Sequence, residues 1–157
     1  MGVLGALVVL AVGVYLVACL LAGFGPAGDL SGFEPDNAPM RRSFRQPTDT
    51  VVAAYRAAVS MTPGMRLAAE GRHELLVDLR PTSRVIGGNF GLVIRLRFRS
   101  EGASTCVEAD ARNKAPFAFS NHGAAFEHAE RALRTRAKRH ASLDEILKGL
   151  GHPKPST

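Results

Sequence analysis

The chain has 157 residues, a formal net charge of +6 at pH 7, and two cysteines. The length leaves room for one domain of ordinary size after an apolar N-terminal stretch, and the cysteine usage gives no evidence of an oxidising compartment. The positive charge attracts nucleic acid, anionic lipid or acidic partners without selecting among them. Sixteen of the twenty basic residues are arginine, which is typical of a GC-rich bacterial genome.

Residues 1–24 are predicted to form a transmembrane anchor. Residues 2–24 carry no charge, and a helix of this length reaches roughly 35 Å, enough for a hydrocarbon core of about 30 Å. A cleaved signal peptide is one alternative. A lipoprotein signal is the other, because Leu16 to Cys19 resembles a lipobox. The apolar run continues past Cys19 and no basic residue precedes it, so we favour an uncleaved anchor over a lipid-modified Cys19.

Residues 25–47 are predicted to be a flexible linker, because four prolines and three glycines among polar residues give little apolar material for a core. Three arginines in this segment, Arg41, Arg42 and Arg45, are candidate contacts for an anionic surface. They also favour a cytoplasmic domain by the positive-inside rule.

Residues 48–140 are predicted to form an α+β domain that begins with a helix ending near Thr62. Two hairpins then follow. A three-residue loop at 71–73 would place Met65 opposite Leu79 and Ala69 opposite Leu75. In the second hairpin, closure at Arg99 and Ser104 would place Arg97 opposite Cys106 and Arg95 opposite Glu108. We therefore expect an antiparallel sheet of four to five strands.

Residues near 120–140 are predicted to form a long helix, and residues 141–157 a short amphipathic helix and tail that begins at a capping box, Ser142 to Glu145. The long helix presents Phe126 toward the sheet, whose strand 92–99 presents Leu96 and Phe98. These three residues are the candidate lining of a pocket for a lipid or small apolar ligand.

The order of a helix, several antiparallel strands and a long helix over residues 48–140 resembles helix-grip domains (START-like and polyketide-cyclase-like) and one TBP-like repeat. A strand ending at Arg112, followed by a helix that opens with Ser120 to Gly123, is similar to small bacterial membrane-anchored domains of unknown function. The resemblance implies the fold and carries over no site residue.

No catalytic, cofactor or metal site is predicted. The glycine-rich stretch at 87–91 lacks the Lys-Ser or Lys-Thr and the following helix that a phosphate loop needs. His122 and His128 lie six apart on a helix, on different faces. With no Trp and no recognisable motif, we expect no nucleic-acid partner.

Strand 92–99 places Arg95, Arg97 and Arg99 on one face, where they could contact an anionic surface or pair with Glu108 and Asp110. Pairing is the interpretation we favour. From the whole sequence we expect a single-pass membrane protein of the cell membrane, not an enzyme, whose domain binds a partner protein or belongs to a membrane complex, with anionic lipid as a further partner. The alternative is binding of a lipid or small apolar ligand between sheet and long helix.

Overall fold

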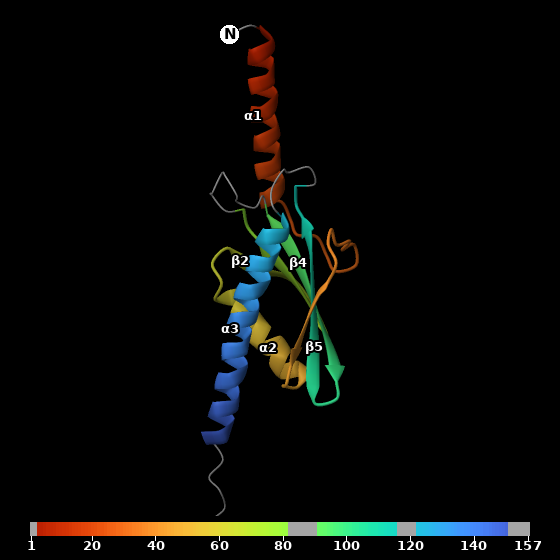
Figure 1. Cartoon of the computed structure of the whole chain (residues 1–157), viewed down its shortest axis with the longest axis vertical. Helices are drawn as coiled ribbons and strands as arrows, with labels where there is room; N and C mark the ends of the chain where they lie inside the picture. The colour runs from red at the N-terminus through yellow and green to blue at the C-terminus, as the bar shows by residue number, and fades with distance from the viewer. Residues whose placement is uncertain (1–2, 82–90, 116–121, 151–157) are drawn as a thin grey trace, which may run out of the picture.

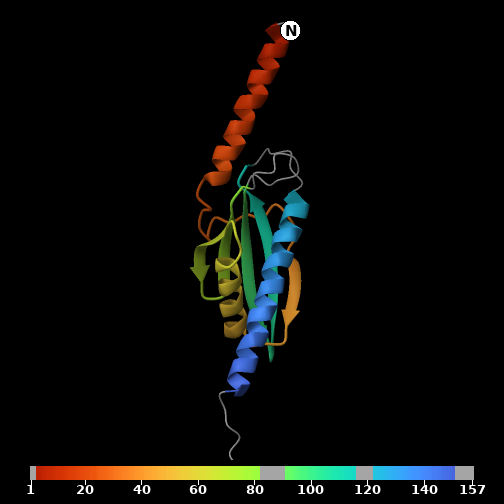
Figure 2. The ribbon, with the colours of Figure 1, turned by 90° about the vertical axis from the view of Figure 1, so that its left-hand side faces the viewer.

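The computed structural model describes residues 3–81, 91–115 and 122–150 and shows the predicted α+β fold. Within these residues, five antiparallel strands form one sheet in the order β1-β5-β4-β3-β2. Two helices cover one face of the sheet, and a third projects away along the long axis of the molecule (Figures 1 and 2). The elements are α1 (Val3–Phe24), β1 (Met40–Phe44), α2 (Thr48–Ser60), β2 (Met65–Gly71), β3 (Glu74–Leu79), β4 (Leu92–Glu101), β5 (Ser104–Asn113) and α3 (His122–Leu150).

The main core lies between α2, α3 and one side of the sheet, which we call the helix face. Strand residues alternate between the two sides of a sheet, so Ile94, Leu96 and Phe98 of β4 all point to this face and are buried. At its centre the ring of Tyr55 packs edge-on against Phe44 and Phe98, with centroid distances of 5.6 and 5.5 Å.

The opposite side of the sheet, which we call the arginine face, is partly covered by residues predicted to be a linker. Ala27 and Phe33 are buried there against Leu76 and Val93. Further along the same segment, Met40–Phe44 is strand β1 and pairs with β5. The linker prediction for residues 25–47 is therefore wrong where Ala27 and Phe33 are buried and where Met40–Phe44 forms a strand. A few apolar side chains between the prolines are enough to cover a small apolar area of a sheet.

The β4–β5 hairpin has the predicted faces and a different register. Arg97 lies opposite Glu108 and Arg95 opposite Asp110, two residues away from the predicted pairs. The turn is tighter than predicted: Glu101 pairs with Ser104, and Gly102 takes the positive φ of 67° that such a turn requires. A shift of two residues preserves which side chains share a face, so the predicted core side of both strands is confirmed.

The β2–β3 hairpin combines two registers. Met65 lies opposite Leu79 and Leu67 opposite Val77, as predicted. A bulge between Leu67 and Ala69 then shifts the pairing, so that Ala69 lies opposite Leu76 and not Leu75. The extra residue leaves a turn of two residues in place of the predicted three.

The long helix α3 continues through the region where a second, shorter helix was predicted. Its buried apolar side chains follow one series at helical spacing, Phe126, Ala129, Leu133, Ala137 and Ala141. This stripe runs on without a glycine or proline, so the capping-box sequence that begins at Ser142 lies inside a helix and starts no new one.

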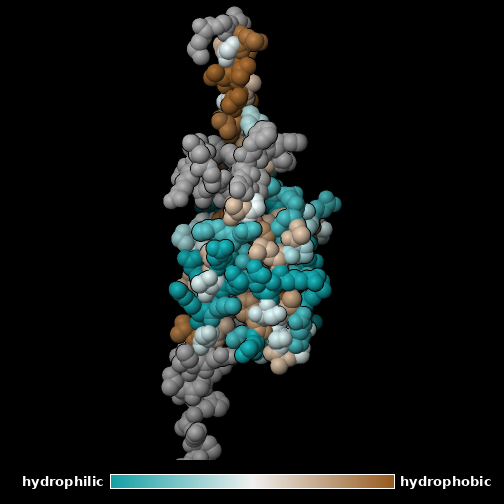
Figure 3. Space-filling view, viewed as in Figure 1, coloured by the Kyte–Doolittle hydropathy of each residue, from teal (hydrophilic) through white to brown (hydrophobic). Residues whose placement is uncertain are grey.

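Helix α1 is the one helix among the described residues that is long and apolar enough to span a membrane. Most of its side chains are exposed, and Figure 3 shows the hydrophobic colour concentrated on α1 while the visible face of the domain is mostly hydrophilic. This pattern is compatible with a single-pass membrane protein.

The end of α1 is fixed to the domain by Lys114. Its ammonium donates hydrogen bonds to the carbonyl oxygens of Gly23 and Gly25, at 3.1 and 2.7 Å. It also pairs with Asp78 at 2.6 Å, and the two side chains are only 4% and 1% exposed. The cation thus satisfies carbonyl groups that a helix end leaves without partners, and it lies where the helix dipole favours positive charge.

Candidate interaction surface

The arginine face carries a cluster of alternating charges on its central strands. Strand register places Glu108 of β5 between Arg41 of β1 and Arg97 of β4, and it places Asp110 opposite Arg95. Neighbouring strands lie about 4.8 Å apart, so these long side chains meet without any change of backbone geometry. We call the six residues the arginine cluster: Arg41, Arg95, Arg97, Arg99, Glu108 and Asp110.

Asp110 fixes two of the guanidinium groups. Arg95 donates to both of its carboxylate oxygens, at 3.1 and 3.0 Å, which is the bidentate geometry that suits this pair. Arg97 donates to the same carboxylate at 3.0 Å. The guanidinium carbon of Arg95 also lies 4.6 Å from the centre of the Phe33 ring, so the covering segment holds this arginine from the other side.

Glu108 is shared by three arginines. Arg41 approaches one of its oxygens at 2.9 Å, and Arg97 and Arg99 approach the other at 3.5 and 3.4 Å. The carboxylate side chain is 3% exposed, whereas those of Arg41 and Arg99 are 68% and 62% exposed. Buried Glu108 therefore holds two largely exposed guanidinium groups in place from beneath, whereas the partners of Asp110, Arg95 and Arg97, are only 15% and 27% exposed.

The cluster has more positive than negative charge, because four arginines surround two carboxylates. A guanidinium has five N–H donors, and Arg41 and Arg99 each use one nitrogen toward Glu108. Both side chains are more than half exposed, so a partner can approach them from solvent. The arrangement suits the binding of carboxylate or phosphate groups, which arginine recognises through paired N–H donors.

Cys106 lies beside the cluster, opposite both Arg99 and Ser43. Burial, followed by the charges of Glu101 and Glu108, raises the pKa of its thiol. A thiol with a raised pKa carries less thiolate at neutral pH and is a weak nucleophile. Among the described residues no group of three His, Cys, Asp or Glu side chains could hold a metal ion.

The six arginines predicted to contact an anionic surface do not all come together. Arg41, Arg95, Arg97 and Arg99 join the cluster, and the predicted pairing with Glu108 and Asp110 is present. Arg42 lies on the other side of β1, where it approaches Glu130 of α3 at 3.7 Å. Arg45 follows β1 and borders a separate shallow groove with Lys138.

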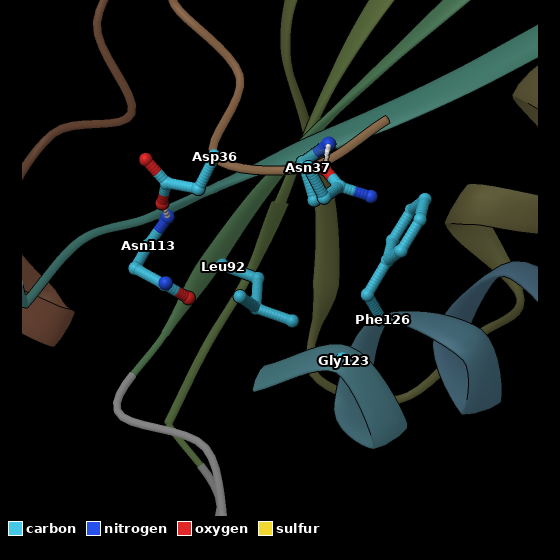
Figure 4. A pocket seen from close by; sticks show the side chains of 7 residues that line it. Asp36, Asn37, Leu92, Asn113, Gly123 and Phe126 are labelled. Carbon is cyan, nitrogen blue, oxygen red and sulfur yellow. Dashed lines mark hydrogen bonds between the residues drawn. The ribbon is translucent and has the colours of Figure 1, made fainter. Parts of the chain in front are cut away.

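The three residues predicted to line an apolar pocket are divided in a similar way. Leu96 and Phe98 are buried in the core. Phe126 lines a pocket of about 250 Å³ nearer to α1, between the sheet and the first turns of α3 (Figure 4). The rest of the lining comes from the segment before β1, from β4, β5 and the start of α3: Asp36, Asn37, Leu92, Ala111, Asn113 and Gly123.

Sequence reasoning missed the contribution of Arg41 and the junction at Lys114. Arg41 was assigned to a linker because residues 40–44 do not alternate apolar and polar side chains, and the alternation of a strand appears only in the burial of the folded segment. Lys114 gives no local signal, since its partners Gly23 and Asp78 are distant in the chain. The glycine-rich stretch at 87–91 falls, except for Gly91, outside the described residues, as does the side chain of His122.

No protein-family model matches the chain. No curated protein matches its sequence at a significant level.

Proposed function

We propose that this protein is a single-pass membrane protein whose domain is a non-catalytic docking module for an acidic segment of a partner protein. The observation that carries the proposal is the arginine cluster, in which two buried carboxylates hold four guanidinium groups and leave Arg41 and Arg99 largely exposed. Arginines already held in position lose less conformational entropy when a partner binds them.

Distance from the membrane favours an acidic protein over the lipid surface beside the anchor. Strand β4 begins at Leu92, directly after Gly91, where an added Cβ would lie against Gly23 at the end of α1. From there β4 runs away from α1 along the molecule (Figure 1). At about 3.3 Å per residue, Arg97 and Arg99 lie roughly 16 and 23 Å beyond Leu92. Electrostatic attraction is screened over about 8 Å at physiological ionic strength, so headgroups of the same membrane attract these arginines only weakly.

The test uses the full chain in nanodiscs of neutral phosphatidylcholine and a fluorescent peptide of ten glutamates. The Arg41→Ala/Arg99→Ala double variant is expected to bind at least tenfold more weakly than the wild type, a loss of about 1.4 kcal/mol. The matched control is Arg131→Ala/Arg139→Ala, which removes the same charge from exposed positions on α3. Binding of this control is expected to change less than threefold.

An equal loss in both double variants would show attraction to net charge alone and overturn the proposal. So would the absence of peptide binding combined with binding to vesicles containing phosphatidylserine that depends on Arg41 and Arg99, since that result assigns the cluster to lipid. Thermal unfolding of each variant shows that binding is compared between folded proteins.

The domain is proposed to lie on the cytoplasmic side of the cell membrane, because Arg41, Arg42 and Arg45 follow the anchor. Protease added to cells with a permeabilised outer envelope is then expected to leave the domain intact. Digestion of the domain in those cells would place it on the other side.

A further inference from the structure

The pocket that contains Phe126 lies at the end of the domain nearest α1. Leu92 and Asn113, which line it, are partners across β4 and β5. The next residues outward are Gly91, where an added Cβ would lie 2.8 Å from the carbonyl oxygen of Gly23, and Lys114, which donates to that same oxygen. On β4 the pocket residue Leu92 is followed outward by Gly91, and on β5 Asn113 is followed by Lys114. Both of these outer residues approach Gly23, at the end of the candidate membrane helix.

This position sets the depth of the pocket relative to a bilayer. A helix of 22 residues is about as long as the hydrocarbon core is thick, so the last turn of α1 lies at the interface between hydrocarbon and headgroups. The pocket, one residue away from the contacts with Gly23 on each strand, therefore lies near the same interface. Molecules that partition into the membrane are concentrated at this depth.

The lining combines an apolar wall with a few fixed polar groups. Leu92, Ala111 and Phe126 supply the apolar part. Its volume of about 250 Å³ exceeds the roughly 150 Å³ with which an apolar cavity already accepts benzene. Sites for small molecules are typically mostly apolar with a small number of placed polar groups.

The polar groups favour a neutral ligand that donates a hydrogen bond. The side-chain oxygen of Asn113 is buried and has no hydrogen-bond partner among the described residues. Because this oxygen has almost no surface open to solvent, the amide of Asn113 has to rotate toward the pocket before a ligand hydroxyl can donate to it, and the pairing then removes the cost of an unsatisfied buried acceptor. The carboxylate of Asp36, bonded at 2.6 Å to the backbone N–H of Asn113, disfavours an anionic ligand in the same pocket (Figure 4).

We infer that this pocket binds a neutral, hydroxyl-bearing, single-chain amphiphile from the membrane. The hydroxyl donates to Asn113, and the adjacent methylenes pack against Leu92, Ala111 and Phe126. The inference is independent of the arginine cluster, which lies on the opposite face of the sheet. The pocket and the cluster are therefore tested by separate experiments.

Equilibrium dialysis tests it with the full chain in phosphatidylcholine nanodiscs and radiolabelled monodecanoylglycerol, with empty nanodiscs subtracted. We expect saturable binding with one molecule per chain. Gly123→Leu enlarges a residue of the pocket lining and is expected to weaken binding at least tenfold. Ala124→Leu, one residue further along α3 and outside the pocket lining, is expected to bind within twofold of the wild type.

Radiolabelled decanoate, with the same chain length and a negative charge, is expected to bind at least tenfold more weakly than monodecanoylglycerol. Equal binding of the two would overturn the inferred preference for neutral ligands. The absence of saturable binding by either molecule, or binding to Gly123→Leu at wild-type strength, would overturn the site itself.

Discussion

Replacing Lys114 with methionine tests the junction between α1 and the domain. Methionine has an unbranched side chain close in length to that of lysine but no ammonium group. The change therefore removes the cation that pairs with Asp78 and that bonds to the carbonyl oxygens of Gly23 and Gly25. Removing one partner of a buried ion pair typically costs about 3–5 kcal/mol, because the other charge remains buried. Asp78 keeps a second partner, since its other oxygen accepts from Arg66 at 2.7 Å.

The lower end of that range is therefore expected, a loss of about 3 kcal/mol. In a chain of this size 1 kcal/mol corresponds to roughly 2–4 °C, so the midpoint of thermal unfolding should fall by on the order of 10 °C. Circular dichroism of the full chain in nanodiscs measures the midpoint. Arg80→Met, which removes an exposed cation, is the matched control and should change stability by less than about 0.5 kcal/mol.

A second variant separates the lost ion pair from the lost caps. In Asp78→Leu/Lys114→Met the buried carboxylate is also gone, and part of the stability should return, because a buried pair replaced by apolar residues is often neutral. If Lys114→Met alone costs less than about 1 kcal/mol, the ion pair and the docking of α1 are refuted together.

Three further experiments test other parts of the structure. Gly91→Ala should destabilise the chain by about 2 kcal/mol more than Gly64→Ala in chemical denaturation, because both glycines have positive φ and only the first would place a Cβ against Gly23; equal losses would contradict the close approach. Phe33→Ala should cost about 3 kcal/mol in the same assay, since the ring packs on Leu76 and Val93; a loss below 1 kcal/mol would return residues 25–37 to the role of a linker. In a Cys19→Ser background, Cys106 should react with iodoacetamide at pH 8 more slowly than free cysteine, because its pKa is raised and less thiolate is present; mass spectrometry showing an equal or faster rate would contradict that shift.

The element order and the faces of the strands could be predicted from the sequence because both depend on local periodicity. Ile94, Leu96 and Phe98 alternate with arginines, and this pattern alone assigns one side of β4 to the core. The exact register depends on the turn. Gly102 can adopt a positive φ, but its sequence context did not reveal that only two residues would form the loop.

The covering segment and β1 were harder to predict, because their stability comes from contacts distant in sequence. In the sequence, Phe33 lies among prolines, glycines and polar residues. The strand residue that it packs against, Val93, is about 60 residues further along the chain. The arginine cluster was likewise predictable only where its residues lie on strands that are adjacent in the sequence. Pairing of arginines with Glu108 and Asp110 was predictable from two adjacent strands, whereas Arg41 required the pairing of β1 with β5.

The contact of Lys114 with the end of α1 also bears on how often the domain meets a partner. A domain on a flexible tether samples a large volume, whereas one held directly against the end of its anchor stays at one height above the bilayer. If the proposed acidic partner lies in the same membrane, its search for the domain becomes nearly two-dimensional, and the effective concentration of the arginine cluster is high only for acidic segments that reach that height. The proposed function then disfavours partners whose acidic segment lies closer to their own membrane helix.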